Sequence, residues 1–450
     1  AAALVLGGGD DDPGDDPRTE TSAGETTETP GDAQASSIDT PLGAPLEVPA
    51  GLGQPLAAPA EWDEGGPCDG DSACAVVADD GDVVSVEAPG DGTATVRSLA
   101  AENGEEQWTL PLDGLSSPPG LARLGDLVIV SSTAGDTRTY RGIDGEGEKR
   151  WELPVPQDDQ PVFPNTQMSE DYGVLLLAEV DAYLVVDLVT GIPQRGEGRV
   201  LATDRTNVYV ADGDRVVARP LADAGTETWE AEGIVSAAPV GAFPAWRFGV
   251  VASDLFVTVT DSEVVALNRE SAAEAWPARV PISADGKDLG RVVAVSNVGD
   301  VVVVAAERGD LGIDARSGTI VWRVMRDRLV FDPELDADTI RAVQGSPVWV
   351  GTGDHLLVGW TGAHIQLIDV TNGEVLGSVD LEPTGGRSAL AIGQEGIAII
   401  EAGGIIAAYG YESIDDPLWT TDAFPEATGL AAVDGGLVVL DPTGLHGLRA

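Results

Sequence analysis

The chain has 450 residues, 43% of them hydrophobic, which is enough to bury a large core. Its 76 acidic residues against 25 Lys and Arg give a formal net charge of -51 at pH 7. Such a charge repels phosphate backbones and anionic lipid surfaces, so we expect neither a nucleic acid partner nor binding to an anionic membrane surface. We interpret the acidity as favouring solubility in a saline exterior.

The N-terminus has two compositionally distinct parts. Residues 1–9 read AAALVLGGG and are far too short to span a bilayer, which takes about 20 apolar residues. Residues 10–60 are rich in Asp, Thr, Pro and Ser, without a hydrophobic period, which is typical of a disordered linker. We interpret residues 1–9 as the remnant of a membrane anchor or signal segment and 10–60 as an acidic tether, with a folded domain over 61–450. The alternative for the first residues is an N-terminal tail without a role.

Two cysteines, Cys68 and Cys74, stand in the sequence CDGDSAC. Five residues separate them, a spacing that a local disulfide can close, whereas a redox-active pair is more often CxxC. A zinc site would need further ligands that the three scattered histidines do not supply. We therefore predict a disulfide, which also favours export.

A short pattern returns eight times along the chain, in which a glycine precedes an aromatic residue by four positions. Its mean spacing is about 44 residues, a period that indicates propeller blades rather than helical repeats. The predicted turn glycines are Gly104, Gly147, Gly191, Gly225, Gly318 and Gly373. The aromatic positions hold Trp108, Trp151, Trp229, Trp276, Trp322 and Trp419. Departures are Ala272 and Asp415 at the glycine position, and Arg195 and Gly377 at the aromatic position.

Short β-branched runs such as LVIVSS, VVVVAA and IAIIEA alternate with Gly- and Asp-containing turns. No long segment shows an apolar period of 3.6 residues, which argues against helices. Residues 121–155 divide into four runs joined by the turns GD, AGD and GEGE. The sequence thus predicts an all-β fold made of four-stranded antiparallel blades.

Each element of the pattern has a structural interpretation. The glycine turns the chain between the third and fourth strands, where a positive φ is needed. The preceding Asp187, Asn268, Asp314 and Asp369 end the third strand and can accept hydrogen bonds from turn amides. The tryptophan lies on the outer strand and covers apolar area of the neighbouring blade, with its indole N–H able to reach a carbonyl.

The stretch LGIDARSGTIVW resembles the repeat of the PQQ-like β-propeller family, Ala-x-Asp-x-x-Thr-Gly-x-x-x-Trp, through Gly312, Asp314, Ser317, Gly318 and Trp322. The resemblance covers roughly residues 74–450 and implies a β-propeller whose tryptophans dock one blade on the next. We expect eight blades, with seven as one alternative and nine, the eight repeats plus the three strands of the last segment, as the other. The last segment offers only three strands, so we expect an N-terminal strand, APLEVPAGL or AAPAEWDEG with Trp62, to complete the ring.

Catalytic patterns are missing from the sequence. True quinoprotein dehydrogenases, which the chain resembles in fold, hold PQQ against a disulfide of adjacent cysteines and bind calcium through Glu, Asn and Asp. Cys68 and Cys74 are not adjacent, and no GxSxG, HExxH or GxxxxGK[ST] is present. His355 and His364 flank one hairpin and could form a metal pair, but we prefer surface positions. We expect no enzyme, no catalytic residue, no metal and no cofactor, although PQQ and Ca²⁺ are not excluded.

Three classes of function stay open. The first is an exported, membrane-anchored, monomeric propeller at the cell envelope that binds or scaffolds a protein, peptide or glycan through its loop faces. The second is an extracellular sensor domain of a bacterial receptor such as a Ser/Thr kinase. The third is a divergent PQQ-dependent dehydrogenase. Residues 325–345 form an insertion that is either a partner contact or a surface excursion of one blade.

Overall fold

A computed structural model describes residues 62–65, 73–78, 81–88, 93–113, 120–124, 126–156, 163–164, 174–178, 182–204, 206–234, 249–284, 287–290, 292–306, 308–325, 349–352, 355–360, 364–380, 390–393, 396–401, 405–411, 416–427, 429–433 and 435–449. Every regular element in these ranges is a β-strand, as predicted. The expected anchor remnant, the expected linker and Cys68 lie outside the described residues, as does nearly all of the insertion at 325–345.

The strands form four-stranded antiparallel sheets, which we number in chain order. Sheet 1 holds β2 (Ala73–Ala78), β3 (Asp82–Ala88), β4 (Thr93–Ala100) and β5 (Glu106–Asp113). Sheet 2 holds β6 (Gly120–Leu124), β7 (Leu127–Ala134), β8 (Thr137–Ile143) and β9 (Lys149–Pro156). Sheet 3 holds β10 (Phe163–Pro164), β11 (Val174–Ala178), β12 (Ala182–Asp187) and β13 (Pro193–Glu197). Sheet 4 holds β14 (Arg199–Thr203), β15 (Asn207–Asp212), β16 (Arg215–Pro220) and β17 (Trp229–Glu232).

The second half of the chain repeats this order. Sheet 5 holds β18 (Gly249–Ala252), β19 (Leu255–Val259), β20 (Glu263–Asn268) and β21 (Val280–Pro281), followed by a small hairpin of β22 (Ser283–Ala284) and β23 (Lys287–Asp288). Sheet 6 holds β24 (Val292–Val298), β25 (Val301–Ala306), β26 (Gly309–Asp314) and β27 (Ile320–Met325). Sheet 7 holds β28 (Trp349–Thr352), β29 (His355–Trp360), β30 (His364–Asp369) and β31 (Val375–Asp380). Sheet 8 holds β32 (Leu390–Ile392), β33 (Gly396–Ile400), β34 (Ile406–Gly410) and β35 (Trp419–Thr421).

Sheet 9 joins the two ends of the domain. It holds β36 (Gly429–Val433), β37 (Gly436–Asp441) and β38 (Gly444–Arg449), and its fourth strand is β1 (Trp62–Gly65). β1 pairs antiparallel with β38, placing Trp62 opposite Gly447 and Gly65 opposite Gly444. An N-terminal strand was expected at this place, and the segment that supplies it is AAPAEWDEG.

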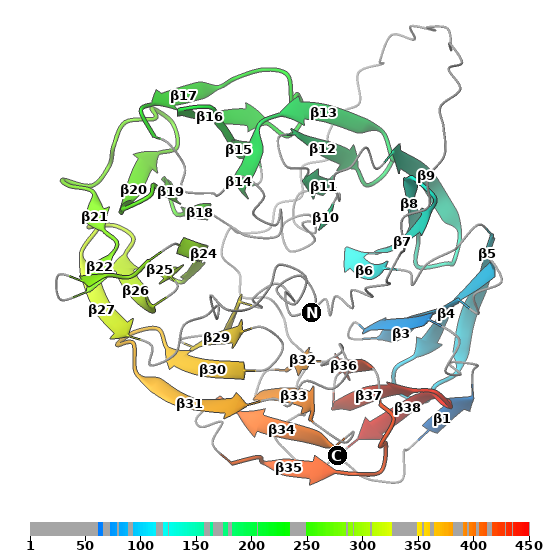
Figure 1. The fold of residues 1–450 in the computed structure, drawn as a ribbon. Coiled ribbons are helices and arrows are strands. Elements are labelled where there is room, and N and C mark those ends of the chain that lie inside the picture. The colour runs from blue at the N-terminus through cyan, green and yellow to red at the C-terminus, as the bar shows by residue number, and fades with distance from the viewer. Residues whose placement is uncertain are drawn as a thin grey trace, which may run out of the picture.

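The sheets stand around a ring, with the first strand of each sheet near the centre and the last at the rim (Figure 1). Neighbouring inner strands touch: β2 contacts β36 and β6, and β18 contacts β14 and β24. In the described part of the chain there are nine four-stranded sheets. This number exceeds the eight blades we expected and equals the alternative of nine, in which the last segment is counted with the eight repeats.

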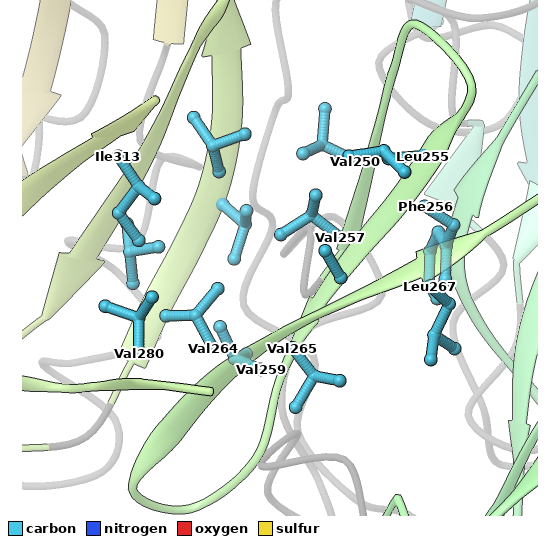
Figure 2. Close-up of a cluster of buried hydrophobic side chains, with 14 of the residues drawn as sticks. Val250, Leu255, Phe256, Val257, Val259, Val264, Val265, Leu267, Val280 and Ile313 are labelled. Atoms are coloured by element: carbon cyan, nitrogen blue, oxygen red, sulfur yellow. The ribbon is translucent and has the colours of Figure 1, made fainter. Parts of the chain in front are cut away.

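The core lies between adjacent sheets, and Figure 2 shows one such contact. Side chains of sheet 5, among them Val264 and Val280, cluster with Ile313 of sheet 6. Strands in the middle of a sheet are therefore buried on both faces, which explains why β25 reads VVVVAA without alternation. Rim strands face solvent on one side, and β5 accordingly alternates between exposed and partly buried positions.

Candidate functional site

Five of the six recurring tryptophans lie on rim strands, and Trp276 lies in the segment that leads into the rim strand β21. Each of four indole Nε1–H groups donates a hydrogen bond to the backbone carbonyl that follows the end of the neighbouring third strand. The pairs are Trp151 to Leu188 at 2.7 Å, Trp229 to Arg269 at 2.6 Å, Trp276 to Ala315 at 2.8 Å and Trp322 to Val370 at 2.6 Å. These contacts join sheets 2 to 3, 4 to 5, 5 to 6 and 6 to 7.

The other two predicted tryptophans differ in detail. Trp108 packs on the turn of sheet 2, where the Cβ that an alanine would place at Gly147 comes within 2.8 Å of its ring. The Nε1 of Trp108 is buried and finds no hydrogen-bond acceptor among the residues that the structure describes. Trp419 is buried in the cluster between sheets 8 and 9.

Four of the turn glycines, Gly147, Gly191, Gly318 and Gly373, face these rings. A Cβ at Gly318 would lie 2.7 Å from the ring of Trp276, and one at Gly373 would lie 2.6 Å from Trp322. Five of the six predicted turn glycines have a positive φ, and so does Ala272: Gly104 (71°), Gly147 (81°), Gly191 (70°), Gly318 (71°), Gly373 (75°) and Ala272 (57°). Gly225 does not, because the chain there reverses through bonds from Asp223 to Pro220 and from Thr226 to Asp223. A left-handed residue is thus not required at Gly225.

The acidic residue that ends the third strand organises the turn. The Oδ1 atom of Asp314 accepts hydrogen bonds from the backbone N–H of Ser317 at 2.8 Å and from its hydroxyl at 2.7 Å. These bonds hold the pKa of Asp314 below its ordinary value, the hydroxyl of Ser317 contributing most. Asp187, Asn268 and Asp369 accept equivalent bonds from the Thr or Ser that follows them. In these four turns the acidic or amide side chain acts together with a Ser or Thr, whereas in sheet 2 Asp144 accepts bonds from the backbone N–H groups of Glu146 and Glu148.

Sheet 3 corrects one sequence assignment. The spacing from Gly191 put Arg195 at the aromatic position, but the residue that docks on sheet 4 is Gln194. Its Nε2 donates to the carbonyl of Ala222 at 3.0 Å, and its Oε1 accepts from the N–H of Ala224 at 3.4 Å. In sheet 6 a β-bulge between Gly312 and Ile313 displaces the register, whereas β12 and β13 pair without one, so the docking position falls one residue earlier.

The residue that pairs with the docking position is small where the docking residue is a tryptophan and large where it is a glycine. Trp151 lies opposite Gly142 and Trp322 opposite Gly312, so that each indole covers a glycine. In sheet 7, where Gly377 replaces the tryptophan, the opposite residue is Leu367, which packs into the cluster with sheet 8. Leu367 is fully buried there. Asp415 lies outside the described residues.

A buried ion pair also connects sheets 4 and 5. Asp204, fully buried, accepts a 2.5 Å hydrogen bond from the hydroxyl of Tyr209 and pairs with the guanidinium of Arg269. Burial alone would raise the pKa of Asp204, but Tyr209, the backbone of Thr206 and Arg269 outweigh it and lower the value. Burial, with Asp204 next in importance, raises the pKa of Tyr209. The carboxylate of Asp204 is therefore charged and hydrogen-bonded by its neighbours. We assign it a structural role.

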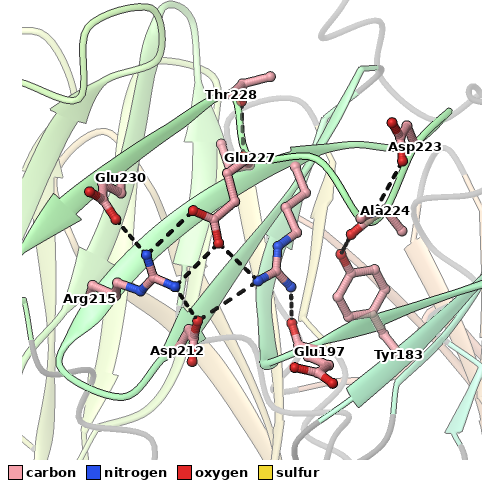
Figure 3. Close-up of polar contacts among 12 residues, drawn as sticks. Tyr183, Glu197, Asp212, Arg215, Asp223, Ala224, Glu227, Thr228 and Glu230 are labelled. Carbon is pink, nitrogen blue, oxygen red and sulfur yellow. Dashed lines mark hydrogen bonds and ion pairs between the residues drawn. The ribbon is translucent and has the colours of Figure 1, made fainter.

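A second polar cluster covers the rim of sheet 4 (Figure 3). Arg215 pairs with Glu230 at 2.5 Å and Asp212 at 2.8 Å. Arg219, which is buried, pairs with Glu227 at 3.3 Å and donates to the backbone carbonyl of Glu197 in sheet 3. These arginines tie the fourth sheet together and to its neighbour, and their donors are engaged by carboxylates and a carbonyl.

The remaining predicted groups are placed as follows. Cys74 lies on β2 and Cys68 outside the described residues, so the disulfide stays a prediction. The register puts His355 opposite Asp369 and His364 opposite Trp360, at opposite ends of the β29–β30 hairpin, which does not bring the two histidines together. Within the ranges that the structure describes, no group of three His, Cys, Asp or Glu residues is placed to hold a metal ion. In those same ranges no helix is long and apolar enough to cross a membrane.

A family model described as outer membrane protein assembly factor BamB matches residues 213–448, a little over half of the 450 residues. The chain belongs to this family. The match confirms the resemblance to PQQ-like propellers on which the interpretation of the repeats depended. A comparison with curated proteins gave no match.

Several solved structures resemble this BamB-family chain. BamB from Moraxella catarrhalis is 14% identical, with 73% of this chain and 95% of that chain covered and a TM-score of 0.46. The computationally designed Ika8 protein is 16% identical, covering 86% and 98%, with a TM-score of 0.47. The C-terminal WD40 domain of Sif2 is 9% identical, covering 84% and 96%, with a TM-score of 0.42.

Proposed function

We propose that the chain is a nine-bladed, non-catalytic propeller, exported and tethered at the cell envelope, that binds a protein partner through its surface. Membership of a family described by an outer membrane assembly factor supports the location and the scaffold role. The acidic, Pro- and Thr-rich segment at 10–60 suits a tether between the ring and an anchor.

One observation carries the binding proposal: the turn of sheet 3 exposes two large apolar side chains. Val189 is 74% exposed and Ile192 is 61% exposed, on either side of Gly191. The equivalent turn of sheet 7 carries Thr371 and Glu374 at these places, both exposed and polar. Exposed apolar groups that a fold does not need mark interaction sites.

Site-specific photocrosslinking in intact cells tests this proposal. A photoreactive amino acid in place of Ile192 should join the chain to one discrete protein in the envelope fraction. The same substitution at Glu374, on the matching turn of sheet 7, should not give that product. Crosslinks of equal yield at both positions, or none at Ile192, would contradict a partner at this turn.

Native mass spectrometry with added PQQ and calcium addresses the catalytic alternative. We expect the mass of the chain alone, since the residues that hold PQQ in the related dehydrogenases are not matched here. A complex containing PQQ and calcium would replace the scaffold by an oxidoreductase.

A further inference from the structure

The rim strand β27 differs from the other rim strands in its chemistry. Within the described sheets, rim strands are broken by proline or carry carboxylates: β5 has Pro111 and Asp113, and β9 has Pro154 and Glu152. Such residues protect an edge from pairing with another chain. β27 reads IVWRVM and contains neither; the same is true only of β35, which has three residues.

The exposed positions of β27 alternate with buried or partly buried ones. Val321 is 46% exposed and Met325 is 45% exposed, and Arg323, exposed as well, stands between them. Arg323 pairs with no carboxylate in the described part of the chain, although the chain has a net charge of -51. Among the described residues, the edge therefore presents one cation without a carboxylate partner, flanked by two apolar side chains.

The strand is also anchored to the neighbouring sheet. Trp322, between the exposed residues, donates its 2.6 Å hydrogen bond to Val370 of sheet 7. β27 pairs with β26 on its inner side, and no described strand pairs with its outer side. An outermost strand offers a row of N–H and C=O groups, and anchoring it beforehand lowers the entropy that a partner must overcome.

We propose that β27 binds an extended segment of a partner protein by strand addition, with an acidic residue opposite Arg323 and apolar residues beside Val321 and Met325. Backbone bonds supply affinity in this mode, and the alternate side chains supply selectivity. Opposite charges in directly facing positions stabilise a strand pair. This binding site lies on sheet 6. It is separate from the site proposed at the turn of sheet 3 and does not depend on it.

A second copy of the chain is a poorer occupant. Two chains of net charge -51 repel each other. An antiparallel pair of β27 strands centred on Arg323 would also place the two guanidinium groups opposite each other, which is destabilising. A foreign strand with one carboxylate avoids both penalties.

The test uses two fluorescein-labelled peptides of eight residues with alternating Val and Thr, one with Glu at a central position and its twin with Lys there. Fluorescence anisotropy with the full chain should show saturable binding of the Glu peptide, about threefold to fivefold tighter than its twin, the size of an exposed charge pair. The variant Arg323→Glu should reverse this preference. Amide hydrogen exchange of residues 321–325 should slow on binding.

Two matched variants locate the site. Val321→Lys places a charge at the edge of β27 and should abolish binding, whereas Thr109→Lys, at an exposed position of the rim strand β5, should leave it unchanged. Absence of binding at millimolar peptide, or an unchanged preference in Arg323→Glu, would overturn the proposal. So would a dimer by analytical ultracentrifugation that Val321→Lys dissolves, since the occupant would then be a second copy. The photocrosslinking experiment at Ile192 tests a different sheet, so either of the two proposals can fail while the other holds.

Discussion

At the scale of single residues, the repeat is a set of steric fits. The indole of one sheet lies on the turn of the next, and at most of these turns the residue beneath the ring is a glycine. Gly318 is one of them, with a positive φ of 71°. Ala272 occupies the same place with a φ of 57°, a conformation that costs an L-residue with a Cβ about 1–2 kcal/mol.

This difference predicts opposite effects for two substitutions. Gly318→Ala should destabilise the protein by about 3 kcal/mol, because it adds backbone strain and a Cβ that would lie 2.7 Å from the ring of Trp276. Ala272→Gly should stabilise it by about 0.5 kcal/mol, since the strain removed slightly exceeds the added freedom of the unfolded chain. Urea unfolding measures both. A loss under about 1 kcal/mol for Gly318→Ala would mean that the turn moves away from the indole.

The sequence predicts these fits only where the spacing is constant. Asp314, Gly318 and Trp322 were found because each acts within one turn or at a fixed offset from it. Gln194 was missed because its place depends on a β-bulge that β12 and β13 lack, and a bulge belongs to the pairing of two strands rather than to either one. The signal available in the sequence was Gln194 itself, which stands one residue before the expected position and has both a hydrogen-bond donor and an acceptor.

At the scale of elements, neighbouring sheets share the repeated tryptophan contact, and some pairs of sheets have a further contact of their own. The pair of Asp204 and Arg269 links turns that are 65 residues apart. Nothing in the local sequence of either turn identifies the other as its partner. Such contacts depend on the ring having formed, which is why the sequence predicted the tryptophan contacts but not this one.

The Asp204 cluster predicts a pH-dependent stability. Its lowered pKa in the folded state contributes stability above the unfolded value, about 3.9, and this contribution is lost as the pH falls through the folded value. Arg269→Ala should cost about 3–5 kcal/mol near pH 7, because it leaves a buried carboxylate without its cation, and less at about pH 3, where that carboxylate can protonate.

Urea unfolding across this pH range provides the measurement. Arg279→Ala is the control: its partner Glu274 is exposed, so we expect a change below about 1 kcal/mol. An equal cost for Arg269→Ala at both ends of the range would assign the effect of Arg269 to packing instead of charge.

At the scale of the whole molecule, the two ends of the domain meet in one sheet. The fold class, the four-stranded unit and the need for an N-terminal closing strand followed from the sequence, since each repeat carries its own pattern. The number of units did not, because the family expectation of eight was preferred to a direct count that the nine sheets match. Val76 and Val83 of sheet 1 pack with Ala431 and Val438 of sheet 9, so the junction has a core besides its backbone pairing.

The closing strand can be tested by two truncations that differ by four residues. Removal of residues 1–61 leaves β1 in place and should not change the unfolding temperature. Removal of residues 1–65 also takes Trp62–Gly65, which pair with β38. That loss of backbone hydrogen bonds should cost roughly 2–4 kcal/mol.

The exposed edge of β38 should also make the shorter chain associate, because an unpaired edge strand accepts strands from other molecules. Calorimetry and light scattering distinguish the two forms. If both truncations unfold at the same temperature and stay monomeric, the packing of sheets 1 and 9 alone holds the ring closed. A lower unfolding temperature and association confined to the shorter form would assign closure to the pairing of β1 with β38.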